Sequence, residues 1–106
     1  MSMKREQAIN GLFVCPCCGY ATLGEVSNYE ICEICFWEDD GQDDPEASES
    51  WGGPNYISLE EGRANFLNLG VSDPKNRGCV RKPKQTDINV RKYKISNGTV
   101  TRAENT

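Results

Sequence analysis

The sequence predicts a small α+β fold made of short β-hairpins, one α-helix and a C-terminal β-hairpin extension. Three observations lead to this prediction. Two Cys-x₂-Cys pairs, at residues 15–18 and 32–35, indicate tight turns between short strands. A Ser-x-x-Glu signature at 58–61 precedes a helix of about residues 59–69, and Asn-Gly at 97–98 lies between two segments typical of strands.

The chain has little apolar material with which to build a core. Only 37% of its 106 residues are apolar, and this fraction includes six cysteines. The large apolar side chains gather between Leu12 and Trp37 and again between Trp51 and Val71. A core drawn from about 60 residues offsets the chain entropy only marginally. We therefore expect the cysteines to supply an additional cross-link.

The first half of the chain predicts short strands separated by turns. Residues 1–11 are polar and are expected to form a loose lead-in. Residues 12–14 predict a strand, residues 19–25 its returning partner, and residues 29–31 a second short strand. Residues 38–50 are acidic and contain Gly and Pro, which predicts an exposed loop.

The helix has recognisable start and stop signals. Ser58 can accept a hydrogen bond from a first-turn N–H group, and Glu61 stands three residues later, as a capping box requires. Gly70 follows the last helical residue and provides the usual stop. Gly62 lies inside the helix and weakens it, because glycine is a poor helix former.

The C-terminal segment predicts a hairpin within residues 88–102, after a linker at 83–87. Asn-Gly at 97–98 favours a type I′ turn, in which Ile95 would face Val100. An isolated hairpin is only marginally stable in water. We therefore expect this hairpin either to dock on the rest of the chain or to be partly disordered.

The spacing of the four paired cysteines is typical of a metal site. Cys15 and Cys18 are separated by thirteen residues from Cys32 and Cys35. Two such turns aim four sulfur atoms at one point, and four thiolates in a tetrahedron suit structural Zn²⁺. Gly19 suits a turn position that needs positive φ. The pattern predicts a zinc-ribbon-like fold whose two Cys-x₂-Cys knuckles hold one structural Zn²⁺ ion.

Two other uses of the cysteines stay open at this point. Six cysteines permit a disulfide framework, and four thiolates also suit iron in a rubredoxin-like site. Residues 1–10 contain no apolar stretch typical of a secretory signal, so we expect a cytoplasmic protein with reduced thiols. No run of residues approaches the length of a membrane span. The surplus Cys17 is expected to point away from the metal, and Cys79 has no assigned task.

The chain contains no histidine, which excludes several kinds of catalytic site. Cys-His and Ser-His nucleophiles and a histidine-bound catalytic zinc are ruled out. A zinc ion with four cysteine ligands has no open position for an activated water. An enzyme would have to use the carboxylates of the acidic segment together with Arg63, and the sequence identifies no general base among them. We therefore expect the protein not to be an enzyme.

Charge is unevenly distributed along the chain. Residues 1–53 carry 2 basic and 11 acidic side chains, whereas residues 54–106 carry 10 basic and 5 acidic ones. Such asymmetry indicates two different surfaces. An acidic face held rigid by zinc would attract a partner protein with a basic surface. The candidate contact residues are Trp37, Glu38, Asp39, Asp40, Asp43, Asp44 and Trp51.

The motifs together resemble the bacterial cysteine-rich CPCC family. The matching segments are Cys-Pro-Cys-Cys-Gly-Tyr at 15–20, Tyr-Glu-Ile-Cys at 29–32, Cys-Phe-Trp-Glu-Asp-Asp-Gly at 35–41, Ser-Leu-Glu-Glu at 58–61 and Gly-Val-Ser-Asp-Pro at 70–74. The resemblance covers residues 12–83, which we take as a CPCC-type zinc-binding domain. It implies a small cytosolic protein whose setting, beside polymorphic toxins, is one in which immunity proteins are common.

Two functional hypotheses follow from the residues and the resemblance. The first is a non-enzymatic protein-binding module, an immunity-type inhibitor whose acidic face binds a basic toxin. The alternative is a nucleic-acid-binding zinc ribbon that uses the basic extension at 84–106. The acidic ribbon itself would be repelled by phosphate, so the extension alone would have to bind.

Overall fold

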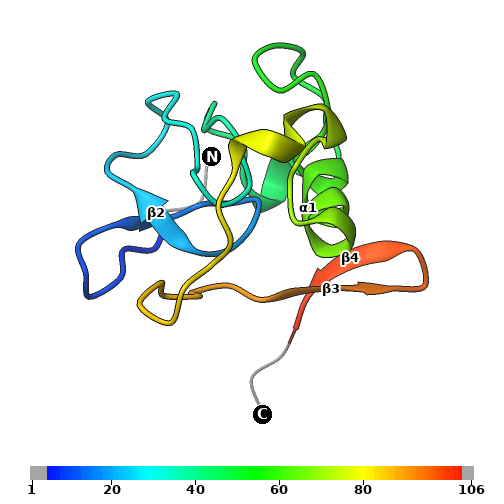
Figure 1. Ribbon diagram of the computed structural model, residues 1–106. Helices are drawn as coiled ribbons and strands as arrows, with labels where there is room; N and C mark the ends of the chain where they lie inside the picture. The colour runs from blue at the N-terminus through cyan, green and yellow to red at the C-terminus, as the bar shows by residue number, and fades with distance from the viewer. Residues whose placement is uncertain (1–4, 104–106) are drawn as a thin grey trace.

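The computed structural model (Figure 1) describes residues 5–103, which contain one α-helix and two small antiparallel sheets. The elements in chain order are β1 (Phe13–Val14), β2 (Ala21–Leu23), the 3₁₀ helix η1 (Asp44–Glu46), α1 (Leu59–Leu69), the 3₁₀ helix η2 (Pro74–Cys79), β3 (Tyr93–Ser96) and β4 (Thr99–Arg102). The predicted small α+β class is confirmed. Residues 1–4 of the expected lead-in and 104–106 of the expected extension lie outside the described residues. None of the described helices is long and apolar enough to cross a membrane.

β1 and β2 form the hairpin that carries the first cysteine pair. Phe13 pairs with Leu23, and Val14 pairs with Ala21, in antiparallel register with a shift between the two pairs. The inward-facing Val14, Ala21 and Leu23 are buried, so the hairpin presents an apolar face to the core. The strand expected at the first apolar run and its returning partner are therefore confirmed in shorter form.

The second short strand, expected at residues 29–31, is wrong. Only Ile31 makes a bridge, with Glu38, and the segment continues no ladder. Ser27 and Tyr29 have positive φ angles of 58° and 59°. A left-handed residue turns the chain sharply, so these residues, one just before the expected strand and one at its first position, interrupt the extended backbone that a strand needs.

The core combines cysteine side chains with a few larger apolar ones. Nine buried residues form one cluster, and five of them are cysteines; the others are Leu23, Ile34, Trp37 and Leu59. Trp37 is completely buried and has the largest side chain in the cluster. The interior therefore contains sulfur where a larger domain would place aliphatic groups.

The α1 helix begins and ends as its sequence signals predict. The Ser58 hydroxyl accepts a hydrogen bond from the Glu61 N–H at 3.0 Å, and Gly70 ends the helix with a φ of 81°. Gly62 has a packing role in the helix. A Cβ atom at this position would lie 3.2 Å from the ring of Trp37 and 3.3 Å from the sulfur of Cys17. Glycine lets α1 approach the cysteine-rich core closely.

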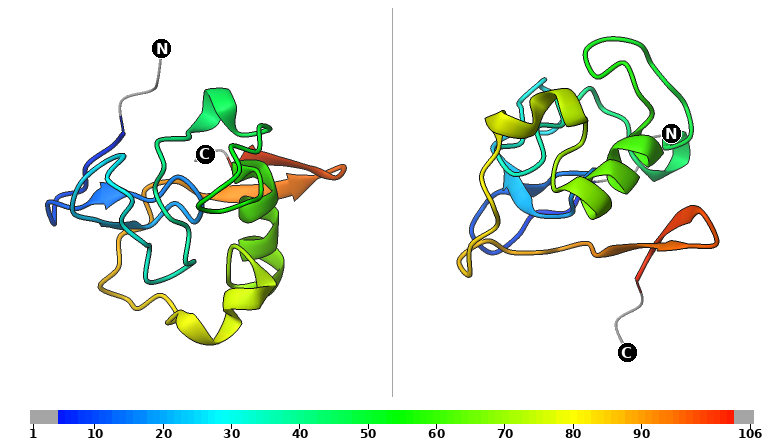
Figure 2. Two further views of the ribbon diagram at one scale, coloured as in Figure 1. Left: turned by 90° about the horizontal axis from the view of Figure 1, so that it is seen from above. Right: turned by 45° about the vertical axis from the view of Figure 1, so that its right-hand side comes forward.

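Residues 88–103, here called the C-terminal strap, run from the β1–β2 hairpin to α1 (Figure 1, Figure 2). The predicted hairpin is confirmed, because β3 pairs with β4 and Ile95 lies opposite Val100. Ahead of β3, the N–H groups of Val90 and Arg91 both donate to the carbonyl of Gly19, at 2.9 and 3.0 Å. The strap is therefore docked along the first cysteine turn.

Buried ion pairs join the strap to both the N-terminal segment and the acidic segment. Arg91 lies 2.7 Å from the carboxylate of Asp43 and 2.6 Å from that of Glu6. Arg5 lies 2.9 Å from Asp43 and 3.1 Å from Asp39. Burial opposes ionisation of Asp43, but the hydrogen bond and charge of Arg91 bring its pKa below the ordinary value. The Asp43 carboxylate is therefore stabilised as an ion inside the protein.

Two expectations about exposure are wrong for this reason. The lead-in is not loose throughout, because Arg5 is buried and Gln7 bridges Phe13. The segment 38–50 is not an exposed loop throughout, because Asp39, Gln42 and Asp43 are buried. Arginines distant in sequence supply the countercharge that makes burial of these carboxylates tolerable.

Replacement of Arg91 by Met is expected to destabilise the metal-loaded protein by about 3–5 kcal/mol, because Asp43 would be left buried with one countercharge fewer. Chemical denaturation followed by circular dichroism measures this loss. The matched control is Lys92→Met, which removes an exposed cation from the next position and is expected to cost less than about 0.5 kcal/mol. Equal denaturation midpoints for the two variants would contradict the proposed role of Arg91.

Two glycines with the same backbone conformation allow the docking of the strap to be tested separately. Gly19 and Gly11 have φ angles of 84° and 85°. A Cβ at Gly19 would lie 1.9 Å from the carbonyl oxygen of Arg91, whereas a Cβ at Gly11 would meet nothing within 4 Å. Gly11→Ala is expected to cost about 1–2 kcal/mol from left-handed strain, and Gly19→Ala about 1–3 kcal/mol more from the clash. If both substitutions cost the same in thermal unfolding, the strap does not press on this turn.

Candidate metal centre

The two cysteine pairs lie in turns that share one hydrogen-bond pattern. In the first turn the N–H of Cys15 donates to the carbonyl of Tyr20 at 2.8 Å, and the carbonyl of Cys15 accepts from the N–H of Gly19 at 2.9 Å. The second turn repeats this pattern. The N–H of Cys32 donates to the carbonyl of the residue five positions later at 2.9 Å, and the carbonyl of Cys32 accepts from the N–H of the residue four positions later at 2.8 Å. Each turn therefore brings the sulfur atoms of its pair to the same side of the backbone.

The residue after each pair has a left-handed backbone. Gly19 has a φ of 84°, as expected from its residue type, and Phe36 has a φ of 69° at the equivalent place in the second turn. A left-handed residue other than glycine costs roughly 1–2 kcal/mol. Phe36 is half-buried, and the apolar surface that it removes from water offsets part of the backbone cost.

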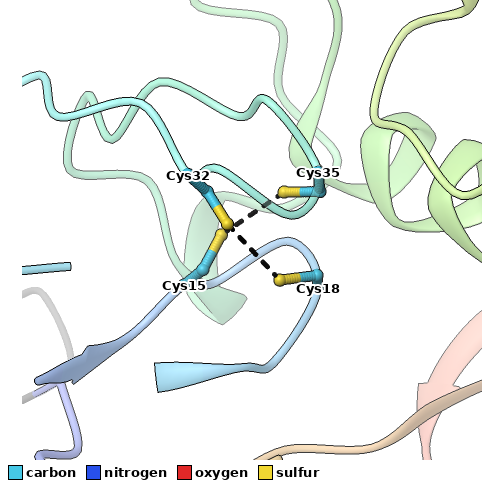
Figure 3. A group of neighbouring side chains, drawn as sticks. All are labelled: Cys15, Cys18, Cys32 and Cys35. Carbon is cyan, nitrogen blue, oxygen red and sulfur yellow. Dashed lines mark hydrogen bonds between the residues drawn. The ribbon is translucent and has the colours of Figure 1, made fainter. Parts of the chain in front are cut away.

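The four predicted ligand sulfurs converge on one point (Figure 3). The sulfur atoms of Cys15 and Cys35 are 3.6 Å apart, those of Cys18 and Cys32 are 3.7 Å apart, and all four lie within 4.8 Å of one another. Four sulfurs bound to one ion at about 2.3 Å would lie about 3.8 Å apart at the corners of a tetrahedron. The site therefore has the donor type, number and spacing that a tetrahedral metal ion requires.

All six cysteines are unpaired thiols in this structure. A disulfide would bring two sulfurs to about 2.05 Å, well below the separations in the centre. The disulfide framework left open by the sequence is therefore not the arrangement adopted here. Iron and zinc both accept four thiolates, and the geometry does not choose between them.

Burial controls the protonation of the four thiols when no cation is bound. It raises the pKa of Cys15 and raises the pKa of Cys18 and Cys35 well above the ordinary value. Cys32 has the opposite shift, because the neighbouring thiols donate hydrogen bonds that lower the pKa of its sulfur, and Thr22 adds another. Without a cation, burial therefore disfavours ionisation of three of the four thiols, and a bound divalent cation reverses this preference.

Further hydrogen bonds orient the ligand side chains. The hydroxyl of Thr22 donates to the sulfur of Cys32 at 3.1 Å, and the backbone N–H of Trp37 donates to the sulfur of Cys35 at 3.4 Å. Donors of this kind fix a ligand's direction and disperse its charge. Thr22 was not identified from the sequence as a residue of the metal centre. The one signal available there was its place on the expected returning strand.

The first turn is also held from outside by α1 and β3. The carbonyl of Pro16 accepts a hydrogen bond from Arg63 at 2.8 Å and another from the hydroxyl of Tyr93 at 3.2 Å. The Arg63 guanidinium lies 4.3 Å from the centre of the Tyr93 ring, in cation–π geometry. Arg63, considered from the sequence as a residue of a carboxylate enzyme, thus contacts the backbone of the metal centre.

The two surplus cysteines lie apart from the group of four ligands. Cys17 is buried, and its sulfur lies toward α1 at Gly62. Cys79 is exposed at the end of η2. Neither joins the described group of four sulfurs.

Three of the predicted partner contacts are inaccessible, and the prediction is corrected for them. Trp37 and Asp39 have no exposed surface, and Asp43 is 1% exposed. Trp37 fills the core beneath α1, while both carboxylates are paired with arginine. A partner cannot reach these side chains in this fold.

The remaining predicted contacts keep some access to solvent. Trp51 is 45% exposed, and Glu38 and Asp40 are half-buried. Asp44 is half-buried and is paired with Arg63 at 2.6 Å and with Arg102 at 2.8 Å. Much of the acidic charge of the first half is therefore neutralised within the molecule.

Comparison with known proteins gives one match. The family model described as Cysteine-rich CPCC matches residues 13–87, which include both cysteine pairs, α1 and η2. No curated protein and no solved structure matches the chain.

Metal binding at neutral pH is expected to release several protons, because cysteine ligands bind as thiolates, whereas a free thiol is protonated at this pH and burial raises the pKa of Cys15, Cys18 and Cys35 further. The affinity should therefore fall steeply as the pH is lowered. Calorimetric titration of Zn²⁺ in buffers of different ionisation enthalpy counts the protons. Cys79→Ser is the control and should leave the count unchanged, whereas Cys18→Ser should lower both the count and the affinity. A proton count near zero for the unmodified chain would contradict this account.

Proposed function

We propose that this chain, which belongs to the cysteine-rich CPCC family, is a non-enzymatic protein-interaction module whose fold is held by one structural Zn²⁺ ion. The observation that carries the proposal is the closed group of four buried thiols, Cys15, Cys18, Cys32 and Cys35. Four protein ligands complete a tetrahedron and leave no position for a substrate or an activated water. The ion would therefore serve the fold and the surfaces that the fold displays.

Zinc is the metal that best suits a reduced compartment such as the cytoplasm, where we place the protein. It has no redox chemistry and accepts four cysteines in a zinc-ribbon-like pair of knuckles. Its binding to such ligands is worth about 10–16 kcal/mol in small peptides. That is as large as the whole stability of a typical domain, about 5–15 kcal/mol, so metal removal should unfold the centre.

The absence of an enzymatic role is also part of the proposal. The chain has no histidine, and Asp43 of the acidic segment is not suited to act as a general base. The hydrogen bonds and charge of Arg91 outweigh the effect of burial and lower the pKa of this carboxyl. A general base needs a pKa near the working pH, which is the opposite shift.

An immunity-type inhibitor is the specific form of this module that the family resemblance favours. The partner would be a toxin or another protein, and the acidic surface left for a basic partner would centre on Glu38, Asp40 and the exposed Trp51. Asp39 and Asp43 have no part in this version, because they are internal ion-pair residues.

Nucleic-acid binding is the second candidate function. Its support is the exposure of Lys84, Lys92 and Lys94, for which no ion-pair partner is found within residues 5–103. Removing the extension would also remove Arg91 and disturb the fold, so the test should replace these three lysines by Glu. A salt-dependent complex with RNA or DNA that is lost in the triple variant would favour this candidate over a protein partner.

The principal test combines metal analysis with capture of partners in the native cell. Native mass spectrometry should show one Zn²⁺ per chain, and cross-linking of tagged protein should enrich a specific protein partner. The variant Cys32→Ser should lose both the ion and the partner, because the surface depends on the metal-held fold, whereas Cys79→Ser should keep both. Capture by Cys32→Ser as efficient as by the unmodified chain would sink the proposal.

A further inference from the structure

An apolar hollow lies beside the C-terminal end of α1. It has a volume of about 290 Å³ and lies between the helix and the chain that follows η2. Its apolar lining comes from Phe66 and Leu69 of the helix and from Val80 and Pro83 beyond η2. Leu69 is 41% exposed, so an aliphatic side chain that would gain from burial faces solvent here.

A second hollow of similar size adjoins the first. It has a volume of about 280 Å³ and lies between α1 and the C-terminal strap, with Tyr20 and Leu67 among its lining residues. Phe66 lines both hollows and therefore stands between them. The two hollows, here called the α1 groove, offer places for two apolar side chains of one extended ligand.

The charged side chains of the α1 groove are all basic. Arg77, Arg81 and Lys82 line the first hollow, Arg91 and Lys92 line the second, and no acidic residue lines either. Arg81 is engaged with Glu33 and Asp87, and Arg91 is engaged with Asp43 and Glu6. Within the described part of the chain, however, no carboxylate pairs with the other three cations, Arg77, Lys82 and Lys92.

We propose that the α1 groove binds an acidic segment of a partner protein that carries apolar side chains between its carboxylates. This inference rests on the proposed interaction function in its general form, and it gives the partner a different surface and the opposite charge from the basic partner of the immunity-type version. Unpaired cations at the rim attract carboxylates, while Phe66, Leu69 and Leu67 provide apolar surface to be buried. The partner's charge is thus opposite to the one that the acidic half of the sequence suggests.

A protein segment fits the groove better than a nucleic acid does. Unstacked bases stack on flat exposed aromatic surfaces. The aromatic residues that line the groove, Tyr20, Phe66 and Tyr93, are half-buried, and its exposed apolar side chains are the aliphatic Leu67 and Leu69.

The test uses the zinc-loaded full-length chain and synthetic peptides as probes. One fluorescent peptide alternates Asp with Leu, a second alternates Lys with Leu, and a third alternates Asp with Ser. Only the first is expected to bind, with an affinity that weakens as salt is added. In NMR spectra of labelled protein its shifts should centre on Leu69, Val80 and Lys82. Equal binding of the Asp/Ser peptide would overturn the apolar part of the proposal, and binding of the Lys/Leu peptide would overturn the charge part.

Matched variants locate the binding site on the protein. Arg77→Glu and Lys82→Glu together should weaken the Asp/Leu peptide by about tenfold or more, whereas Lys94→Glu on the hairpin should change it little. Leu69→Ser tests the apolar lining of the groove. Ile95→Ser is its control, because Leu69 and Ile95 are 41% and 42% exposed. Circular dichroism and metal content must be unchanged in each variant used. If the groove variants bind the peptide as the controls do, the proposal is wrong.

Four further outcomes separate this proposal from its rivals. Displacement of the peptide by an RNA or DNA oligonucleotide at equal concentration would assign the groove to nucleic acid. Concentration-dependent dimers that are lost in Lys82→Glu would assign it to a second copy of the chain. A native partner that still binds the Arg77→Glu and Lys82→Glu double variant would refute the groove and leave the interaction function standing. Absence of any native partner would count against the interaction function itself.

Discussion

The convergence of four thiols on one buried point is the constraint on which the rest of the structure depends. Cys15, Cys18, Cys32 and Cys35 occupy the centre of a core that contains few other large apolar side chains. Burial disfavours ionisation of most of these sulfurs, so the centre is poorly suited to stand alone and well suited to a divalent cation. The packing of the core, the two cysteine turns and the affinity for a metal ion therefore all depend on the same four sulfur atoms.

A second constraint is the neutralisation of buried carboxylates by arginines from both ends of the chain. Arg5 and Arg91 meet at Asp43, so segments separated by most of the sequence are fastened at one residue. Such a pair is costly to break, although an apolar replacement of the whole cluster need not be less stable. The C-terminal strap is consequently part of the folded body, although the family match ends at residue 87.

These two constraints determine which surfaces are left for a partner. The metal site is closed, and Asp39, Asp43 and Asp44 of the acidic half are paired with arginines of the same chain. What stays available near α1 is a groove with aliphatic side chains and unpaired cations. Net charge along a sequence is therefore a poor guide to the sign of a binding surface when the charges pair across the fold.

The sequence by itself determined the features that depend on neighbouring residues. The cysteine spacing identified four sulfurs that do converge, Ser58 and Gly70 marked the ends of α1, and Asn97-Gly98 marked the turn between β3 and β4. Each is a local rule of hydrogen bonding or backbone conformation. Only the tertiary structure decided that Asp39 and Asp43 are internal, that Thr22 contacts a ligand sulfur, and that the strap lies against Gly19. Those outcomes depend on contacts between residues far apart in the chain, and the free energy of burying a charge depends on which distant partner arrives beside it.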